Sequence, residues 1–107
     1  MYNISNIKSA VLKKRVRFRH HSAAMMIERN ISKDEVYKTI ADGEFIEEYL
    51  NDKPFPSYLV FYKVEQNPLH VVCSYNFIDE YAIIITVYRP DTGHFEDDYK
   101  TRRKNHG

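Results

Sequence analysis

The stretch YAIIITVY, residues 81–88, decides the fold that we expect for this chain. Its centre, Ala82-Ile83-Ile84-Ile85, is continuously apolar, which is typical of a β-strand that is buried on both faces. The sequence Arg89-Pro90-Asp91 follows directly, and proline there ends the strand. We therefore expect one fully buried strand near the end of the chain.

The residues before this strand have the pattern of three more strands, at 45–50, 58–64 and 69–76. Turn-forming residues separate them, Asn51 to Pro54 and then Glu65 to Pro68. Short connections favour antiparallel neighbours. The second half of the chain is thus predicted to be a four-stranded antiparallel sheet.

The first half carries the periodicity of three helices, at about residues 4–14, 21–29 and 33–42. Ser32 followed by Glu35 is a capping-box pattern, Asn30 suits a left-handed helix end, and Gly43 ends the third helix. Residues 15–19 alternate basic and apolar side chains, which favours a short extended segment with its basic side chains on one face. The predicted class is α+β, with N-terminal helices packed on one face of the sheet.

Size and composition limit the possible classes of protein. The 107 residues are expected to form a single domain. The one cysteine, Cys73, excludes an internal disulfide and a cysteine-based zinc site, and it fits a reducing cytoplasm. No apolar run is long enough for a membrane-spanning helix, and the first residues lack the pattern of a signal peptide.

The net charge of +1 hides an uneven distribution. Residues 1–30 carry seven Lys and Arg against one Glu, and residues 100–107 carry four Lys and Arg and no acid, whereas the middle of the chain is acidic. Two basic ends that meet in the fold would bind phosphate groups. We expect the basic tail to fray from about residue 99.

Two histidines are the main candidates for chemistry. His21 opens the second helix and His70 lies in the third strand. Imidazole is the side chain whose ordinary pKa suits proton transfer near neutral pH, and arginine binds phosphate through two parallel hydrogen bonds. Together with Tyr88 they would cleave RNA without a metal ion, using the RNA's own 2′-hydroxyl as nucleophile. The candidate catalytic residues are His21, His70, Arg29 and Tyr88, and the candidate substrate-binding residues are Arg17, Arg19, Thr86 and Arg89.

Each candidate also has a structural interpretation. His21 can satisfy backbone groups at a helix start, Arg29 can be a surface residue, and Tyr88 can belong to the core. The face of the sheet on which His70 lies is not determined by the pattern, and His94 and His106 in the tail carry little signal. No spacing of His, Cys, Asp or Glu supports a metal site.

Five short motifs resemble the bacterial domain-of-unknown-function family numbered 4258. They are HSAAMMIERNI (21–31), GEFIEEY (43–49), PFPSYL (54–59), PLHVV (68–72) and ITVYRPD (85–91). The resemblance implies a barnase/RelE-like nuclease fold and a toxin of a toxin–antitoxin pair. Three positions depart from the family pattern, because Met25 replaces an arginine, Asn30 replaces a glycine and Ser22 replaces an alanine.

The function that we expect is that of a small metal-independent ribonuclease, with RNA as substrate, a cognate antitoxin as partner and no cofactor. The alternatives are a non-catalytic protein-interaction domain, which the loss of arginine at Met25 favours, and a nucleic-acid-binding domain that does not cleave.

Overall fold

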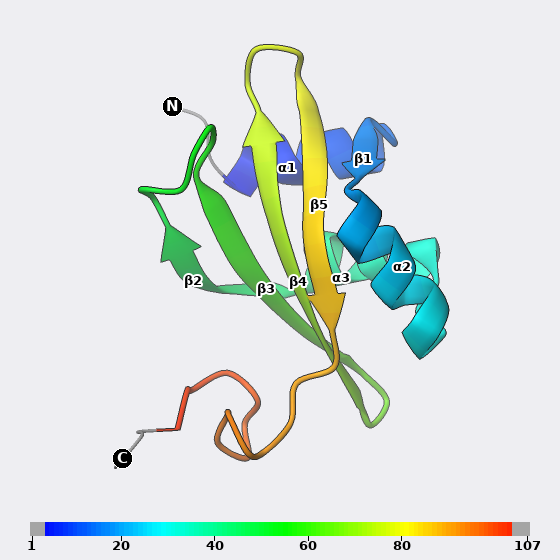
Figure 1. The fold of residues 1–107 in the computed structure, drawn as a ribbon, viewed down its shortest axis with the longest axis vertical. Helices are drawn as coiled ribbons and strands as arrows, with labels where there is room; N and C mark the ends of the chain where they lie inside the picture. Colours follow the sequence, from blue (N-terminus) through cyan, green and yellow to red (C-terminus); the bar gives the residue numbers. More distant parts are fainter. Residues whose placement is uncertain (1–3, 104–107) are drawn as a thin grey trace.

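The computed structural model describes residues 4–103, which form one α+β unit (Figure 1). Within these residues no helix is long and apolar enough to cross a membrane. The elements in chain order are α1 (Ile4–Leu12), β1 (Val16–Phe18), α2 (His20–Arg29), α3 (Lys33–Asp42), β2 (Glu44–Tyr49), β3 (Ser57–Val64), β4 (Asn67–Asn76) and β5 (Tyr81–Tyr88).

The strands form one mixed sheet in the order β1-β5-β4-β3-β2. Strands β2 to β5 are antiparallel neighbours, as expected. The prediction of four strands was wrong by one, since β1 pairs in parallel with β5, with Arg17 opposite Ile83. The pattern at 15–19 indicated an extended segment, but its partner lies far away in sequence and no local pattern identifies it.

This fifth strand explains the apolar character of β5. Strand β5 lies between β1 and β4, so it is not an edge strand. Ala82 and Ile84 point toward the helices and are fully buried, and Ile83 on the opposite face is only 8% exposed. Strand β5 is therefore buried on both faces at Ala82, Ile83 and Ile84, as predicted, whereas Ile85 is half-buried.

The helices lie on one face of the sheet. Figure 1 shows α1 and α3 behind the strands and α2 beside β5. Apolar side chains from the helices meet every second side chain of the inner strands, and this alternation makes the core. Its fully buried members include Ile7, Val36, Ile40, Val60, Val71, Ile84 and Val87.

The predicted ends of α3 and the predicted C-terminal end of α2 are confirmed, whereas α1 ends at Leu12 rather than at about residue 14. The Ser32 hydroxyl accepts a hydrogen bond from the backbone N–H of Glu35 at 3.1 Å, which caps α3. Asn30 ends α2 in the left-handed conformation. Gly43 ends α3 where a Cβ atom would lie 2.6 Å from the carbonyl oxygen of Phe61, so a larger residue cannot fit without a shift.

The face of the sheet away from the helices, here called the open face, meets the end of the chain. Residues 90–103, the C-terminal segment, fold back onto it, and Phe95 is 2% exposed there. We expected fraying from about residue 99, whereas Tyr99 and Arg102 are held by contacts with β4 and β2. Residues 104–107 lie outside the described part of the chain.

Candidate active site on the open face

His70 lies on the open face. Its neighbours Leu69 and Val71 belong to the core beneath the helices, and side chains alternate along a strand. His70 stands opposite Phe61 of β3 and Tyr88 of β5, whose side chains therefore share its face. The side chain of His70, whose face could not be assigned from the sequence, thus points away from the helices.

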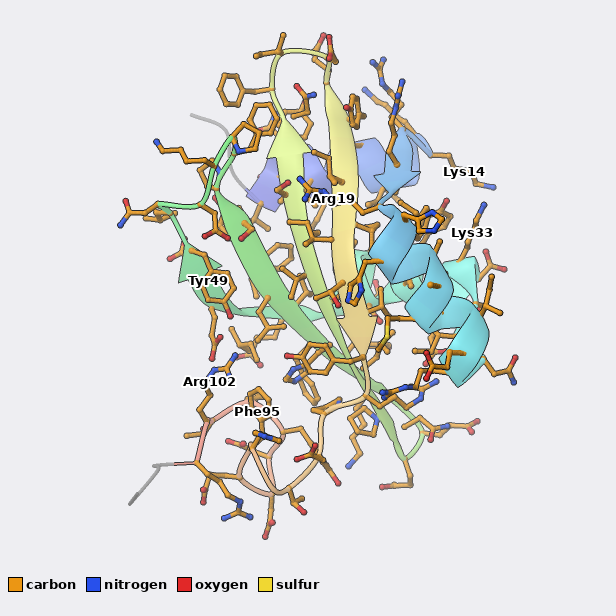
Figure 2. All side chains as sticks on the ribbon, viewed as in Figure 1. Lys14, Arg19, Lys33, Tyr49, Phe95 and Arg102 are labelled. Atoms are coloured by element: carbon orange, nitrogen blue, oxygen red, sulfur yellow. The ribbon has the colours of Figure 1, made fainter. Side chains whose placement is uncertain are left out.

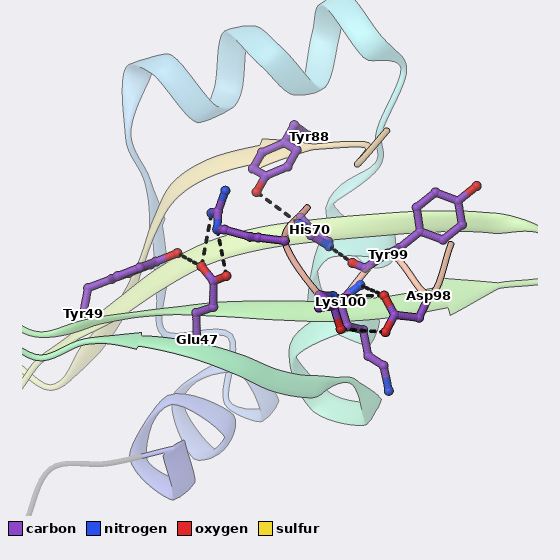
Figure 3. A network of polar contacts seen from close by, with 9 residues as sticks. Glu47, Tyr49, His70, Tyr88, Asp98, Tyr99 and Lys100 are labelled. Atoms are coloured by element: carbon purple, nitrogen blue, oxygen red, sulfur yellow. Dashed lines mark hydrogen bonds and ion pairs between the residues drawn. The ribbon is translucent and has the colours of Figure 1, made fainter. Parts of the chain in front are cut away.

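The imidazole of His70 is fully buried and uses both nitrogens (Figure 3). Nε2 lies 2.6 Å from the carbonyl oxygen of Tyr99, and Nδ1 lies 3.0 Å from the hydroxyl of Tyr88. A carbonyl only accepts, so Nε2 carries the hydrogen and Nδ1 accepts from Tyr88. Burial lowers the pKa of His70, which keeps the ring neutral. His70 therefore fixes the position of Tyr88.

An ion pair ties the C-terminal segment to β2. Arg102 donates from Nε and Nη2 to the two carboxylate oxygens of Glu47, at 2.8 and 3.1 Å. The Tyr49 hydroxyl donates to the same carboxylate. Desolvation alone would raise the pKa of Glu47, but the hydrogen bonds from Arg102 and Tyr49 outweigh it and lower the pKa. Glu47 is therefore charged at neutral pH.

Beside this network lies a hollow of about 240 Å³, here called the tail hollow. Its lining consists of Tyr88, Pro90, Asp91, His94, Phe95 and Arg102. The guanidinium of Arg102 lies over the ring of Phe95, 4.9 Å from its centre (Figure 2). Burial raises the pKa of Tyr88, so its hydroxyl keeps its proton. The tail hollow thus combines a cation, an imidazole and an aromatic wall.

His94 is oriented by Asp91 at the mouth of the tail hollow. The Nδ1 atom of His94 lies 3.0 Å from the carboxylate of Asp91, and the hydrogen bond lowers the pKa of that carboxyl. A carboxylate accepts only, so Nδ1 carries the hydrogen. In the tautomer with this hydrogen on Nδ1, the free lone pair of the imidazole is on Nε2, which is the arrangement of a general base.

The structure does not bring the two predicted histidines together. His21 is exposed in the first turn of α2, which packs beside β5 on the helix side, whereas His70 points to the open face. Within residues 4–103 the side chain of His21 makes no hydrogen bond or ion pair. Arg29 is exposed in the last turn of the same helix. Among the predicted catalytic residues, His70 and Tyr88 alone are in direct contact.

The predicted substrate-binding residues lie in different places. Arg89 donates from Nη1 and Nη2 to the carboxylate of Glu35, at 2.9 and 3.1 Å, which joins the end of β5 to α3. Thr86 lies on the open face opposite Val72. The other two are also exposed: Arg17 lies opposite Ile83 near the start of β5, and Arg19 lies beside Ile84 in the middle of that strand.

The sequence did not reveal several residues of this site. Glu47 and Arg102 are 55 residues apart, and neither pattern nor spacing relates them. Asp91 and His94 are three residues apart and follow a proline, a spacing that allows the side-chain hydrogen bond seen here. This spacing is the one feature of the sequence from which part of the site could have been predicted. In the described part of the chain no cluster of His, Cys, Asp and Glu could hold a metal ion.

Comparison with known proteins gives one match. A family model described as "Domain of unknown function (DUF4258)" matches residues 18–89, about two thirds of the chain. No curated protein and no solved structure matches. The matched range contains Glu47, His70 and Tyr88 and ends before Asp91.

Proposed function

The chain belongs to this family of unknown function, and from that premise we propose that it is a small ribonuclease that cleaves RNA without a metal ion. The observation that carries the proposal is the tail hollow, where His94, Arg102 and Tyr88 line one space. The barnase/RelE-like nuclease fold that the sequence motifs imply agrees with the α+β class. Met25, where the family pattern has arginine, lies on α2 and takes no part in the proposed chemistry.

The proposed reaction uses the 2′-hydroxyl of RNA as nucleophile. Nε2 of His94 takes the proton of this hydroxyl, and the oxygen attacks the adjacent phosphorus. Glu47 binds Nε and Nη2 of Arg102, so we assign to Nη1 of this guanidinium the role of stabilising the negative charge that develops on the phosphate oxygens. The protonated imidazole then gives its proton to the leaving 5′-oxygen. The products are a 2′,3′-cyclic phosphate and a 5′-hydroxyl, so no atom or electron is left unaccounted for.

The remaining residues position these groups. The ring of Tyr88 offers a wall on which a base can stack, and His70 holds its hydroxyl. Glu47 holds Arg102 at the hollow, and Asp91 selects the tautomer of His94. In this proposal His94 replaces His21 as the base, and His70 is a positioning residue.

Incubation of the purified protein with single-stranded RNA in excess chelator tests the proposal. We expect cleavage to a cyclic phosphate, and no cleavage of DNA of the same sequence, which lacks the 2′-hydroxyl. Intact RNA at high concentrations of folded protein would overturn it, and so would cleavage of the DNA at an equal rate.

The toxin role is the second part of the proposal. Induced expression of the wild type in bacterial cells should slow growth and degrade cellular RNA. Expression of His94→Ala at the same level should do neither. Equal growth arrest by both proteins would show that cleavage is not the cause.

A second candidate function is that of a non-catalytic interaction domain. It is favoured by a surface hollow of about 490 Å³ beside α2, whose lining is mostly apolar and in which Ile27 is 84% exposed. Under this function His94→Ala would leave every cellular phenotype unchanged, whereas Ile27→Lys would abolish partner binding. The opposite pair of results supports the ribonuclease.

A further inference from the structure

Four basic side chains gather where α1, β1 and α2 meet. We call Lys14, Arg15, Arg17 and Arg19 the basic rim; all four are exposed. A surface hollow of about 570 Å³ is lined by the first three of these, Lys14, Arg15 and Arg17, together with Val16, Asp79 and Tyr81. In Figure 2, Lys14 and Arg19 lie away from Arg102 and Phe95, which belong to the C-terminal segment below the sheet.

The charges of the basic rim are not neutralised by ion pairs. Among residues 4–103, every ion pair involves other basic side chains, such as Arg89 and Arg102. Arg15 donates to the backbone carbonyl of Asp79 at 3.2 Å rather than to its carboxylate. The guanidinium groups therefore remain available to an anion from outside.

Arg17 and Tyr81 give the rim a second feature, an aromatic surface. The guanidinium of Arg17 lies over the ring of Tyr81, 4.6 Å from its centre, which holds the arginine in a defined position. Cations combined with an aromatic ring are the elements with which proteins bind single-stranded nucleic acid, through its phosphates and its stacked bases. An acidic protein partner would pair with the arginines but would not need the ring of Tyr81 beneath Arg17.

Arg17 of the basic rim and Tyr88 of the tail hollow belong to the same face of the sheet. Arg17 stands opposite Ile83, which points away from the helices, and Tyr88 at the other end of β5 also faces that way. Tyr81 and Tyr88 are seven positions apart on one strand, about 23 Å at the usual rise of a β-strand. One extended strand of nucleic acid lying along β5 would reach both.

We propose that the basic rim is a second binding site for the RNA substrate, which holds the backbone of the strand several nucleotides from the bond that is cleaved. This inference rests on the proposed function for its substrate. It adds that long RNA is bound at two places, whereas a dinucleotide is bound only at the tail hollow. Removal of rim charges should therefore affect KM for long RNA and leave the chemical step unchanged.

The test compares two double variants that each remove two positive charges. Arg17→Gln/Arg19→Gln alters the rim, and Lys38→Gln/Lys53→Gln alters exposed lysines on α3 and in the β2–β3 loop. Each is made with His94→Ala, so that labelled RNA of about twelve nucleotides stays intact while binding is measured by fluorescence anisotropy over a range of salt. The rim variant should bind about tenfold more weakly, with a salt slope lower by about two. The lysine variant should bind within about twofold of its parent.

The second readout separates this inference from the proposed function. With His94 intact, the rim variant should lose kcat/KM on long RNA and cleave a dinucleotide as fast as the wild type. Equal loss of binding in both double variants, or none in the rim variant, overturns the rim as a site. RNA that is bound through the rim but never cleaved overturns the ribonuclease and leaves the rim standing.

Discussion

The Nε2 atom of His70 lies 2.6 Å from the carbonyl oxygen of Tyr99, so the C-terminal segment supplies the partner of a fully buried histidine. This contact fixes the tautomer of His70, and the tautomer in turn makes Nδ1 the acceptor for the Tyr88 hydroxyl. The order of the tail, the protonation state of the ring and the position of Tyr88 are therefore linked.

The first prediction concerns pH and the stability of the fold. The pKa of folded His70 is lowered from 6.5, mainly by burial, so the unfolded chain binds more protons as the pH falls through that value. The stability that neutral His70 provides is present above about pH 6.5 and is lost progressively below it. Urea unfolding of the wild type should thus show a lower free energy of unfolding at about pH 5 than at pH 7.5.

The variant His70→Gln isolates this effect. At neutral pH it should lower the free energy of unfolding by about 1–3 kcal/mol, because it disturbs two buried hydrogen bonds. It should also lose less stability than the wild type on acidification. His20→Gln, at an exposed position, is the control and should follow the wild type. An unchanged pH dependence in His70→Gln would assign the effect to another group.

The second prediction concerns the ion pair that holds the tail. Arg102→Gln should speed amide hydrogen exchange in residues 94–102, because it removes both hydrogen bonds to Glu47. The free energy of unfolding should fall by less than about 1 kcal/mol, since the Arg102 side chain is half exposed. Arg103→Gln removes the neighbouring charge, which pairs within the tail with Glu96. Equal exchange in the two variants would mean that the Glu47 contact does not anchor the segment.

The third prediction compares the contributions of His94 and His21 to the cleavage of RNA. His94→Ala should lower kcat/KM for RNA about a hundredfold or more, the usual contribution of a general base. Asp91→Asn should lower it less, because the base remains but loses its orienting carboxylate. His21→Ala should cleave like the wild type, since His21 is exposed on α2 and does not contact the tail hollow. Loss of activity in His21→Ala alone would restore the assignment made from sequence.

Structural features that depend on neighbouring residues could be predicted from the sequence. The Ser32 cap and the left-handed Asn30 depend on neighbouring residues, and both were predicted correctly. The strand at 81–88 was predicted from its unbroken apolar run. Features that join distant residues were not predictable in the same way, because one sequence does not say which strand lies beside which.

The candidate site illustrates this limit. His70 could be placed on a strand, but its face depends on which side the helices cover, and that is a property of the whole fold. The sequence analysis assigned Arg89 to phosphate binding, but in the fold its guanidinium pairs with the carboxylate of Glu35 from α3. Arg102 was assigned to a fraying tail, since nothing near it in sequence indicates Glu47 as a partner.

The last prediction concerns Ser22, where the family pattern has alanine. Ser22 is fully buried, and its hydroxyl lies 2.8 Å from the carbonyl oxygen of Arg19 and 3.0 Å from that of Ile84, which ties α2 to β5. The carbonyl of Ile84 also accepts from the backbone N–H of Arg19, so Ser22→Ala leaves it with a partner. Thermal and urea unfolding should show a loss of about 1 kcal/mol or less.

The larger substitution Ser22→Val is the matched control, because it removes the same hydroxyl and adds volume where there is no exposed surface. It should cost a further 1–3 kcal/mol, roughly, through overpacking between α2 and β5. If Ser22→Ala were instead as damaging as Ser22→Val, the hydroxyl rather than the close fit would be holding α2 on the sheet. The alanine of the family pattern would then require a compensating contact elsewhere in the relatives.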